Sequence, residues 1–255
     1  MNPVSMTLSQ LRYVNKAFWR NPASAFFIFA FPLMFLVIFT SLLGHGTVHL
    51  GGRSIHQSTY YVAAMGAYGV ISACYSNIAI SLTVQRDAGI LKRTHGTPLP
   101  ATVYFAARVL HSLLVAVLLV AITVAFGRLF YQADIPTGAA LARFLAALAV
   151  GAAAFSALGF AITAVIPNAD AAAPIVNASI LPLLFLSGIF IPIGDNAPSW
   201  IVWVARVFPV KHFADCFSAG YLGTAFRWSD LLIVAAWGFG ALIFARFRFT
   251  WEPRT

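Results

Sequence analysis

Long apolar runs alternate with short polar stretches along the whole chain. A run of about 20 apolar residues has the length of a helix that crosses the hydrocarbon core of a membrane. Six such runs occupy residues 23–43, 59–83, 103–126, 139–166, 171–192 and 231–247. The pattern predicts an all-α integral membrane protein, with a single transmembrane domain over residues 1–255.

The polar stretch before the first run has a helical pattern of its own. Arg12, Lys16 and Arg20 lie four residues apart, beside apolar side chains at helical spacing. A basic stripe of this kind suits a helix that lies in the headgroup layer. We therefore predict an amphipathic interfacial helix in residues 1–22. A plain basic tail is the alternative, because the polar and apolar faces are not cleanly separated.

Residues 193–229 hold two apolar pieces that are flanked by charges and are too short to cross a membrane. Aromatic side chains of the interfacial type are present at Trp200, Trp203, Tyr221 and Trp228. Tryptophan and tyrosine concentrate where the membrane meets water. We predict short outer helices that are re-entrant or lie on the membrane surface.

A polar loop with several glycines is expected at residues 44–58. Its histidines are His45, His49 and His56. A zinc site is disfavoured there, because no cysteine or carboxylate lies nearby and the glycines oppose the helix that would align two histidines.

Composition agrees with a membrane protein and limits what else the chain can hold. Hydrophobic residues make up 60% of the chain and charged residues 9%, against about 25% charged residues in soluble domains. The six runs leave no room for a soluble domain of about 100 residues or more, so we expect any energy source to lie outside the chain. Cys74 and Cys216 suggest neither a disulfide framework nor a metal site.

Basic residues lie beside the apolar runs and orient them. If both ends and residues 86–108 share one side, that side carries ten Lys and Arg and the other carries six. The positive-inside rule makes the first side cytoplasmic, with both termini inside. No nucleic-acid partner is expected, because the basic residues form no patch with exposed aromatics. The preference for arginine over lysine and the abundant alanine favour a bacterial protein of the cytoplasmic (inner) membrane.

The second run carries a set of polar and aromatic side chains on one face. Spacings of four and three residues place the set on a single side of a helix. The set is Tyr61, Met65, Tyr68, Ser72 and Tyr75. Phenols are poorly satisfied in hydrocarbon, so this face should meet protein or a cavity. Two interpretations remain open: hydrogen bonding between helices at a subunit contact, and the lining of a substrate path.

Charge gathers between the second and third runs, in residues 84–102. The charged side chains that could pair with another protein are Arg86, Asp87, Lys92 and Arg93. In a short cytoplasmic helix, Ile90 and Leu91 would form an apolar knob, and Gly89 would allow close approach. Pro98 would end that helix before the third run. The segment suits a surface that binds another protein. The alternative is an ordinary loop whose positive charge only orients the spans.

Several enzyme classes are disfavoured by the motifs that the sequence lacks. No Gly-Lys dipeptide occurs, so the chain has no P-loop for ATP. The absence of a His-Glu-x-x-His motif and of paired mid-membrane carboxylates argues against intramembrane proteases. Carboxylates such as Asp170 and Asp215 fall at the ends of spans or outside them, which disfavours coupling to an ion gradient. We expect no catalytic residue, no metal site and no cofactor in this chain.

Two motifs occur together in this sequence. The first is formed by Arg86, Asp87, Gly89, Ile90, Leu91 and Pro98. The second is formed by Leu186-Ser187-Gly188-Ile189-Phe190-Ile191-Pro192, Pro198-Ser199-Trp200 and Phe208-Pro209. They resemble the coupling helix, and the element before the last span, in the membrane subunits of type-2 ATP-binding-cassette (ABC) exporters. Gln85 departs from the family, which usually has a carboxylate there, and this departure questions a salt bridge at the start of the coupling helix.

The resemblance implies a permease that works as two copies, identical or related, with two separate ABC ATPase subunits. Those ATPases would bind ATP and magnesium. Coupling to the ATPase is expected at Arg86, Asp87, Gly89, Ile90, Leu91, Lys92, Arg93 and Pro98. The substrate path is expected at Phe35, Phe39, Tyr61, Tyr68, Ser72, Tyr75, Asn177 and Ser187. Such a lining suits export of an amphipathic cargo, namely a drug, a lipid or a lipid-linked glycan. The competing function is a membrane channel or assembly subunit without an ATPase partner.

Overall fold

The computed structural model describes residues 2–43, 46–50, 53–192 and 198–253. It confirms the predicted fold class, because six helices within those ranges are long and apolar enough to cross a membrane. These spans are α2 (Pro22–Leu43), the continuous helix Gln57–Asp87, α6 (Ala101–Tyr131), α7 (Gly138–Thr163), α8 (Ala169–Leu186) and α11 (Trp228–Arg248).

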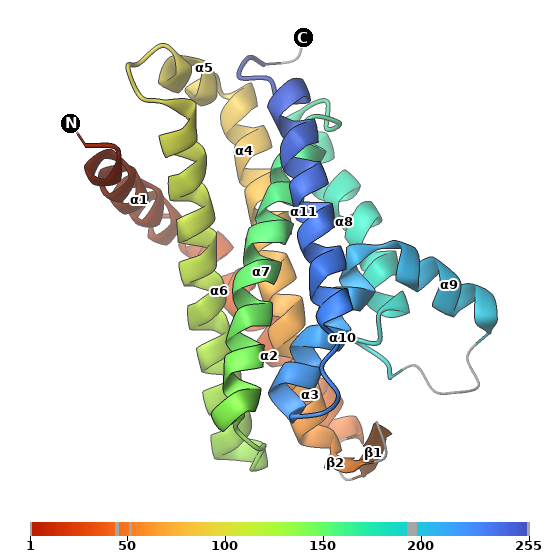
Figure 1. Cartoon of the computed structure of the whole chain (residues 1–255). Coiled ribbons are helices and arrows are strands. Elements are labelled where there is room, and N and C mark those ends of the chain that lie inside the picture. Colours follow the sequence, from red (N-terminus) through yellow and green to blue (C-terminus); the bar gives the residue numbers. More distant parts are fainter. Residues whose placement is uncertain (1, 44–45, 51–52, 193–197, 254–255) are drawn as a thin grey trace.

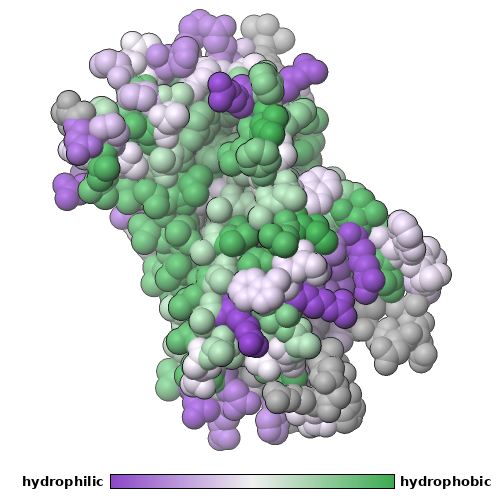
Figure 2. Space-filling view, viewed as in Figure 1, coloured by the Kyte–Doolittle hydropathy of each residue, from purple (hydrophilic) through white to green (hydrophobic). Residues whose placement is uncertain are grey.

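The spans form a bundle with distinct ends (Figure 1). The two ends of the chain lie at the same end as the helix α5 (Ile90–His95), which connects the second and third spans. Apolar side chains gather over the middle of the bundle, and hydrophilic ones gather toward its two ends and in a further group at the lower right (Figure 2). This distribution fits a multi-pass membrane protein, in which the apolar band faces hydrocarbon.

The second span is an α-helix interrupted by one π-helical turn. It consists of α3 (Gln57–Ile71), the π-helix η1 (Ser72–Ser76) and α4 (Asn77–Asp87). A π-turn adds a residue to the helical repeat, so side chains before and after η1 do not keep the common face that regular spacing predicts. Gly159 of α7 packs against this turn, since a Cβ there would lie 2.9 Å from the carbonyl oxygen of Tyr75.

The predicted N-terminal helix is present as α1 (Pro3–Trp19), which packs against α6. It starts at Asn2, whose side chain accepts a hydrogen bond from the backbone N–H of Val4 at 3.2 Å. The ring of Trp19 stacks on Phe29 of α2 at 5.9 Å. Most of α1 is exposed, with only Val14 buried, as expected for a helix lying in the headgroup layer.

A β-hairpin replaces part of the expected polar loop at the end of the bundle opposite α5 (Figure 1). Strands β1 (Thr47–Leu50) and β2 (Arg53–His56) pair antiparallel. Thr47, Val48 and Ile55 are β-branched and favour extended backbone, a signal that the glycines of the segment obscured. His45 lies outside the described residues.

The outer segment contains two helices, α9 (Ser199–Val207) and α10 (Pro209–Leu222), with different environments. α9 projects sideways from the bundle, and its Trp200 and Trp203 are exposed (Figure 1). α10 does not lie on the surface, because it packs against α3, α7 and α11 and buries Phe213 and Phe217. Residues 193–197 of the predicted segment lie outside the described residues.

A buried contact between a histidine and an aspartate fixes the start of α10 to the start of α11. His212 Nδ1 lies 2.7 Å from the Asp230 carboxylate, and its Nε2 lies 2.9 Å from the backbone carbonyl of Arg206. The imidazole thus joins three elements: α9, α10 and α11.

Candidate functional site

The segment between the second and third spans folds as the short helix α5. It begins after Gly89, whose φ of +69° costs glycine no steric strain. A side chain at Gly89 would meet nothing within 4 Å. The positive φ of the turn therefore explains why glycine stands here, and tight packing within the chain is not the reason. Pro98 is exposed between α5 and α6, and Pro100 directly precedes α6.

α5 presents a basic surface with one apolar side chain. Lys92 and Arg93 are exposed, and Ile90 is 45% exposed. Leu91 is fully buried and packs in a cluster with Leu82 of α4. The exposed apolar knob therefore consists of Ile90 alone, while Leu91 fixes α5 to the bundle.

Arg86, at the end of α4, turns into the protein and is 2% exposed. Its guanidinium donates hydrogen bonds to the backbone carbonyls of Thr163 at 2.9 Å, Ile166 at 2.9 Å and Pro167 at 3.0 Å. Carbonyls at a helix C-terminus lack intrahelical donors and carry partial negative charge. The sequence led us to expect Arg86 to pair with charges of another protein, but the structure uses its guanidinium to hold the turn between α7 and α8.

Asp87 completes this connection on the other side of the turn. Its Oδ1 lies 3.3 Å from Arg86 Nε, and its Oδ2 accepts a hydrogen bond from the backbone N–H of Ala169 at 2.5 Å. Asn168 caps the same helix by accepting from the N–H of Ala171 at 2.9 Å. A carboxylate is favourable at a helix N-terminus. Two consecutive side chains therefore join the end of α4 to the end of α7 and the start of α8.

Gln85 also makes a specific contact, although it is not the carboxylate usual in the resembled family. Its Oε1 accepts a hydrogen bond from Arg108 Nη2 of α6. The same Nη2 donates to Tyr104 Oη at 3.0 Å, and the guanidinium lies 5.2 Å from the centre of the Tyr104 ring. Gln85 therefore contacts a basic side chain of α6 through a hydrogen bond.

The segment after α11 packs over α5, a contact that the sequence analysis missed. The Trp251 ring centre lies 4.9 Å from that of His95 and 5.6 Å from that of Tyr104. Lys92 Nζ lies 3.2 Å from Glu252 Oε1, with both side chains well exposed, so this pair stabilises little. The available sequence signal for this contact was Trp251, an aromatic residue that lies between Arg248 and Arg254.

Four of the expected path residues meet in one aromatic cluster between α2 and α3. Phe39 stacks on Tyr61 at 5.3 Å, and Phe35 lies 6.1 Å from Tyr68. Phe190, from the motif after α8, lies 5.5 Å from both Phe35 and Tyr68. Tyr61 is fully buried, so the cluster closes the space between these helices.

The other four expected path residues lie elsewhere. Tyr75 Oη lies 2.6 Å from Ser179 Oγ of α8, and Ser72 is half-buried in η1. Asn177 is exposed on α8. Ser187 is buried, and its hydroxyl donates to a backbone carbonyl of α8 at 2.8 Å, so this hydroxyl serves the end of the helix.

Two polar side chains inside the spans escaped the sequence analysis. The Tyr60 hydroxyl donates to the carbonyl of Gly188 and so ties α3 to the turn after α8. His111 of α6 is 4% exposed, and neither ring nitrogen has a hydrogen-bond partner among the described residues. The Phe18 ring meets it edge-on at 5.2 Å. The available sequence signal for His111 was its position inside the third apolar run.

Comparison with known proteins adds an independent observation. Residues 8–222 match the family model described as ABC-2 type transporter. Two similar proteins are each named probable multidrug ABC transporter permease YbhR, one from Escherichia coli K12 and one from Escherichia coli O157:H7. Each is 27% identical over 175 residues, which cover 67% of this chain and 47% of the relative. The chain spans about half the length of the curated relatives it matches.

Proposed function

The chain belongs to the ABC-2 type transporter family, and from this premise we propose that it is the permease subunit of an ATP-driven exporter. Its cargo is amphipathic: a drug, a lipid or a lipid-linked glycan. The multidrug permeases named among its relatives support the first of these. In this proposal the chain is not catalytic, and a separate ABC ATPase binds ATP and magnesium and hydrolyses the ATP.

The observation that carries this proposal is the connection from α5 into two other spans. Lys92, Arg93 and Ile90 are available on the surface for an ATPase. Behind them, Leu91 is buried against the end of α4, where Arg86 holds the turn between α7 and α8. A push on α5 therefore reaches α4, α7 and α8 together, as movement of packed helices as near-rigid bodies requires.

The aromatic cluster supports the placement of the cargo path between α2, α3 and the turn after α8. Its rings provide apolar surface, and the phenols of Tyr61 and Tyr68 add polar atoms, which together suit an amphipathic molecule. The Tyr75–Ser179 contact of 2.6 Å joins η1 to α8. In the proposed cycle, the displacement of α8 breaks this contact and opens the cluster.

A second permease copy, identical or related, fits the spans that this chain leaves uncovered. In the most apolar stretch of each span, the share that is buried inside the protein is 28% for α2 and 22% for α8, compared with 61% for Gln57–Asp87. We propose that these exposed faces meet the second copy and membrane lipid. Both termini and α5 share one end of the bundle (Figure 1). We assign this end to the cytoplasm of a bacterial cell, and we assign the protein to the inner membrane.

The proposal is tested by purification from native membranes in mild detergent. We expect an ATPase with a P-loop to co-purify and to hydrolyse ATP in the complex. Reversing both exposed charges of α5, with Lys92→Glu and Arg93→Glu, should abolish co-purification. The matched control reverses Arg206 and Arg227 on the outer segment, which changes the net charge equally and should leave the complex intact. If the wild-type chain purifies without any ATPase, the channel or assembly function replaces the exporter.

A further inference from the structure

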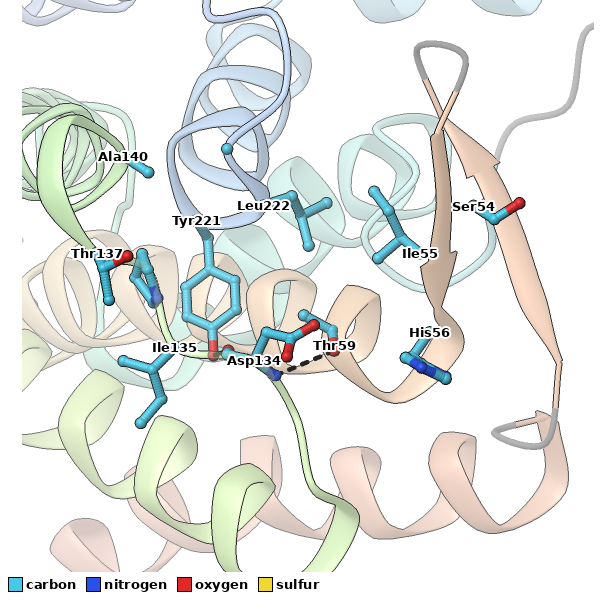
Figure 3. A pocket seen from close by; sticks show the side chains of 12 residues that line it. Ser54, Ile55, His56, Thr59, Asp134, Ile135, Thr137, Ala140, Tyr221 and Leu222 are labelled. Atoms are coloured by element: carbon cyan, nitrogen blue, oxygen red, sulfur yellow. Dashed lines mark hydrogen bonds between the residues drawn. The ribbon is translucent and has the colours of Figure 1, made fainter.

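A cavity of about 340 Å³ opens at the end of the bundle opposite α5. It lies where β2, the start of α3, the loop before α7 and the end of α10 meet (Figure 3). Pockets for small molecules have volumes of about 300–1,000 Å³, so this one suits a compact ligand. Its location, outside the aromatic cluster, separates it from the proposed cargo path.

The backbone of Asp134 holds this cavity in shape. Its N–H donates to Thr59 Oγ1 at 3.2 Å, and its carbonyl accepts from Tyr221 Oη at 2.8 Å. Burial raises the pKa of the Tyr221 phenol, and the charge of Asp134 raises it further, so this hydroxyl stays protonated and donates. The shape of the loop therefore does not depend on the Asp134 side chain.

The Asp134 carboxylate is exposed at the cavity, where a ligand can reach it. Among the side chains that the structure describes, it has no hydrogen-bond or ion-pair partner. Arg128, a basic residue near this loop, donates to the carbonyl of Ala133 at 3.4 Å. In Figure 3 the carboxylate stands beside the Tyr221 ring, and Leu222 and Ile55 border the same space.

This combination of groups selects the charge and shape of a ligand. A carboxylate attracts a cation, and an aromatic face within about 6 Å adds to that attraction. Leu222 and Ile55 offer apolar surface to the rest of the ligand. A metal ion fits less well, because no group of three or more His, Cys, Asp or Glu that could hold one occurs among the described residues.

We propose that this cavity binds a small organic cation, that is, a protonated amine attached to an apolar body. The ammonium group pairs with Asp134, and the body packs on Leu222 and Ile55. The assignment goes beyond the proposed exporter function, because the binding of an amine here requires neither an ATPase nor the aromatic cluster.

The test uses 4-phenylbutylammonium and its uncharged analogue 4-phenylbutanol as probes. Binding to the purified chain in lipid nanodiscs, without ATPase or ATP, is measured by calorimetry. A partly exposed ion pair corresponds to a preference for the amine over the alcohol of about fivefold. Asp134→Asn should abolish this preference, and Asp134→Glu, which keeps the charge, should retain it. Asp170→Asn, which removes an exposed carboxylate near the α5 end, should bind both probes like the wild type.

Equal binding of amine and alcohol by the wild type would overturn the proposal. An Asp134→Asn variant that keeps the wild-type preference would overturn it as well. Thermal melting of each variant verifies that the fold is intact, as the backbone bonds of Asp134 lead us to expect. Because no ATPase is present, failure in this assay concerns the cavity alone, while the exporter proposal is judged by co-purification.

Discussion

Replacing Arg86 by alanine tests how firmly α4 is joined to the turn between α7 and α8. The change removes hydrogen bonds from one buried guanidinium to the carbonyls of Thr163, Ile166 and Pro167. A hydrogen bond from a charged donor contributes about 1.5–3 kcal/mol. Removing one partner of a buried charged interaction costs about 3–5 kcal/mol, so we expect a total loss of that size, below the sum of three independent bonds.

The loss is measured as the free energy of unfolding in mixed micelles titrated with sodium dodecyl sulfate and followed by circular dichroism. Arg86→Lys keeps the charge but lacks the planar fork that reaches three carbonyls, so it should recover only about half of the loss. Arg93→Ala is the matched control, because this arginine is exposed and its bonds to Gly89 and Ala88 carbonyls are 3.4 and 3.3 Å long. The control should change stability by less than about 0.5 kcal/mol.

The reasoning is refuted if Arg86→Ala unfolds no more easily than Arg93→Ala. It is also refuted if Arg86→Lys is as stable as the wild type, because a point charge alone would then account for the connection.

Two further substitutions, one of them with a matched control, are tested by the same unfolding titration, and a third is tested by amide hydrogen exchange. Gly89→Ala should destabilise by about 1–2 kcal/mol, because alanine is strained at the φ of +69° although the space is open; no loss would contradict this account of the turn. Gly159→Val should cost about 1–3 kcal/mol or more by pushing α7 away from the carbonyl of Tyr75, whereas Gly240→Val, with open space around it, should cost about 1 kcal/mol or less. Trp251→Ala should speed amide hydrogen exchange in α5 by removing the ring that packs on His95, and unchanged exchange would show that Trp251 does not stabilise α5.

Much of the fold could be predicted from the sequence, because runs of about 20 apolar residues have few structural alternatives. The six predicted spans all occur, with ends shifted by a few residues: the fifth run, 171–192, became α8 at Ala169–Leu186. Pro174 and Pro182 lie inside that helix, which continues past both of them. The hairpin was missed, because glycines in residues 44–58 outweighed the β-branched residues around them.

Side-chain placement was less predictable, because it depends on partners far away in the chain. Nothing near Arg86 indicates that it will meet carbonyls some 80 residues later. Likewise, the regular spacing from Tyr61 to Tyr75 predicted one face, but Tyr75 lies within η1 and contacts Ser179. A π-turn has no clear sequence signal, and here it accompanies close packing of α7 at Gly159.

The central claim, that an ATPase subunit binds α5, is tested most directly by cross-linking. The chain's own cysteines, Cys74 and Cys216, are buried, so a cysteine introduced as Arg93→Cys would be the exposed thiol. A short thiol-reactive cross-linker applied to native membranes should join this residue to a subunit that carries a P-loop, and the cross-link should change in yield when ATP is added. Arg227→Cys, on the outer segment, should give no such product. If Arg93→Cys yields no P-loop protein, or if both positions yield the same one, the account is contradicted.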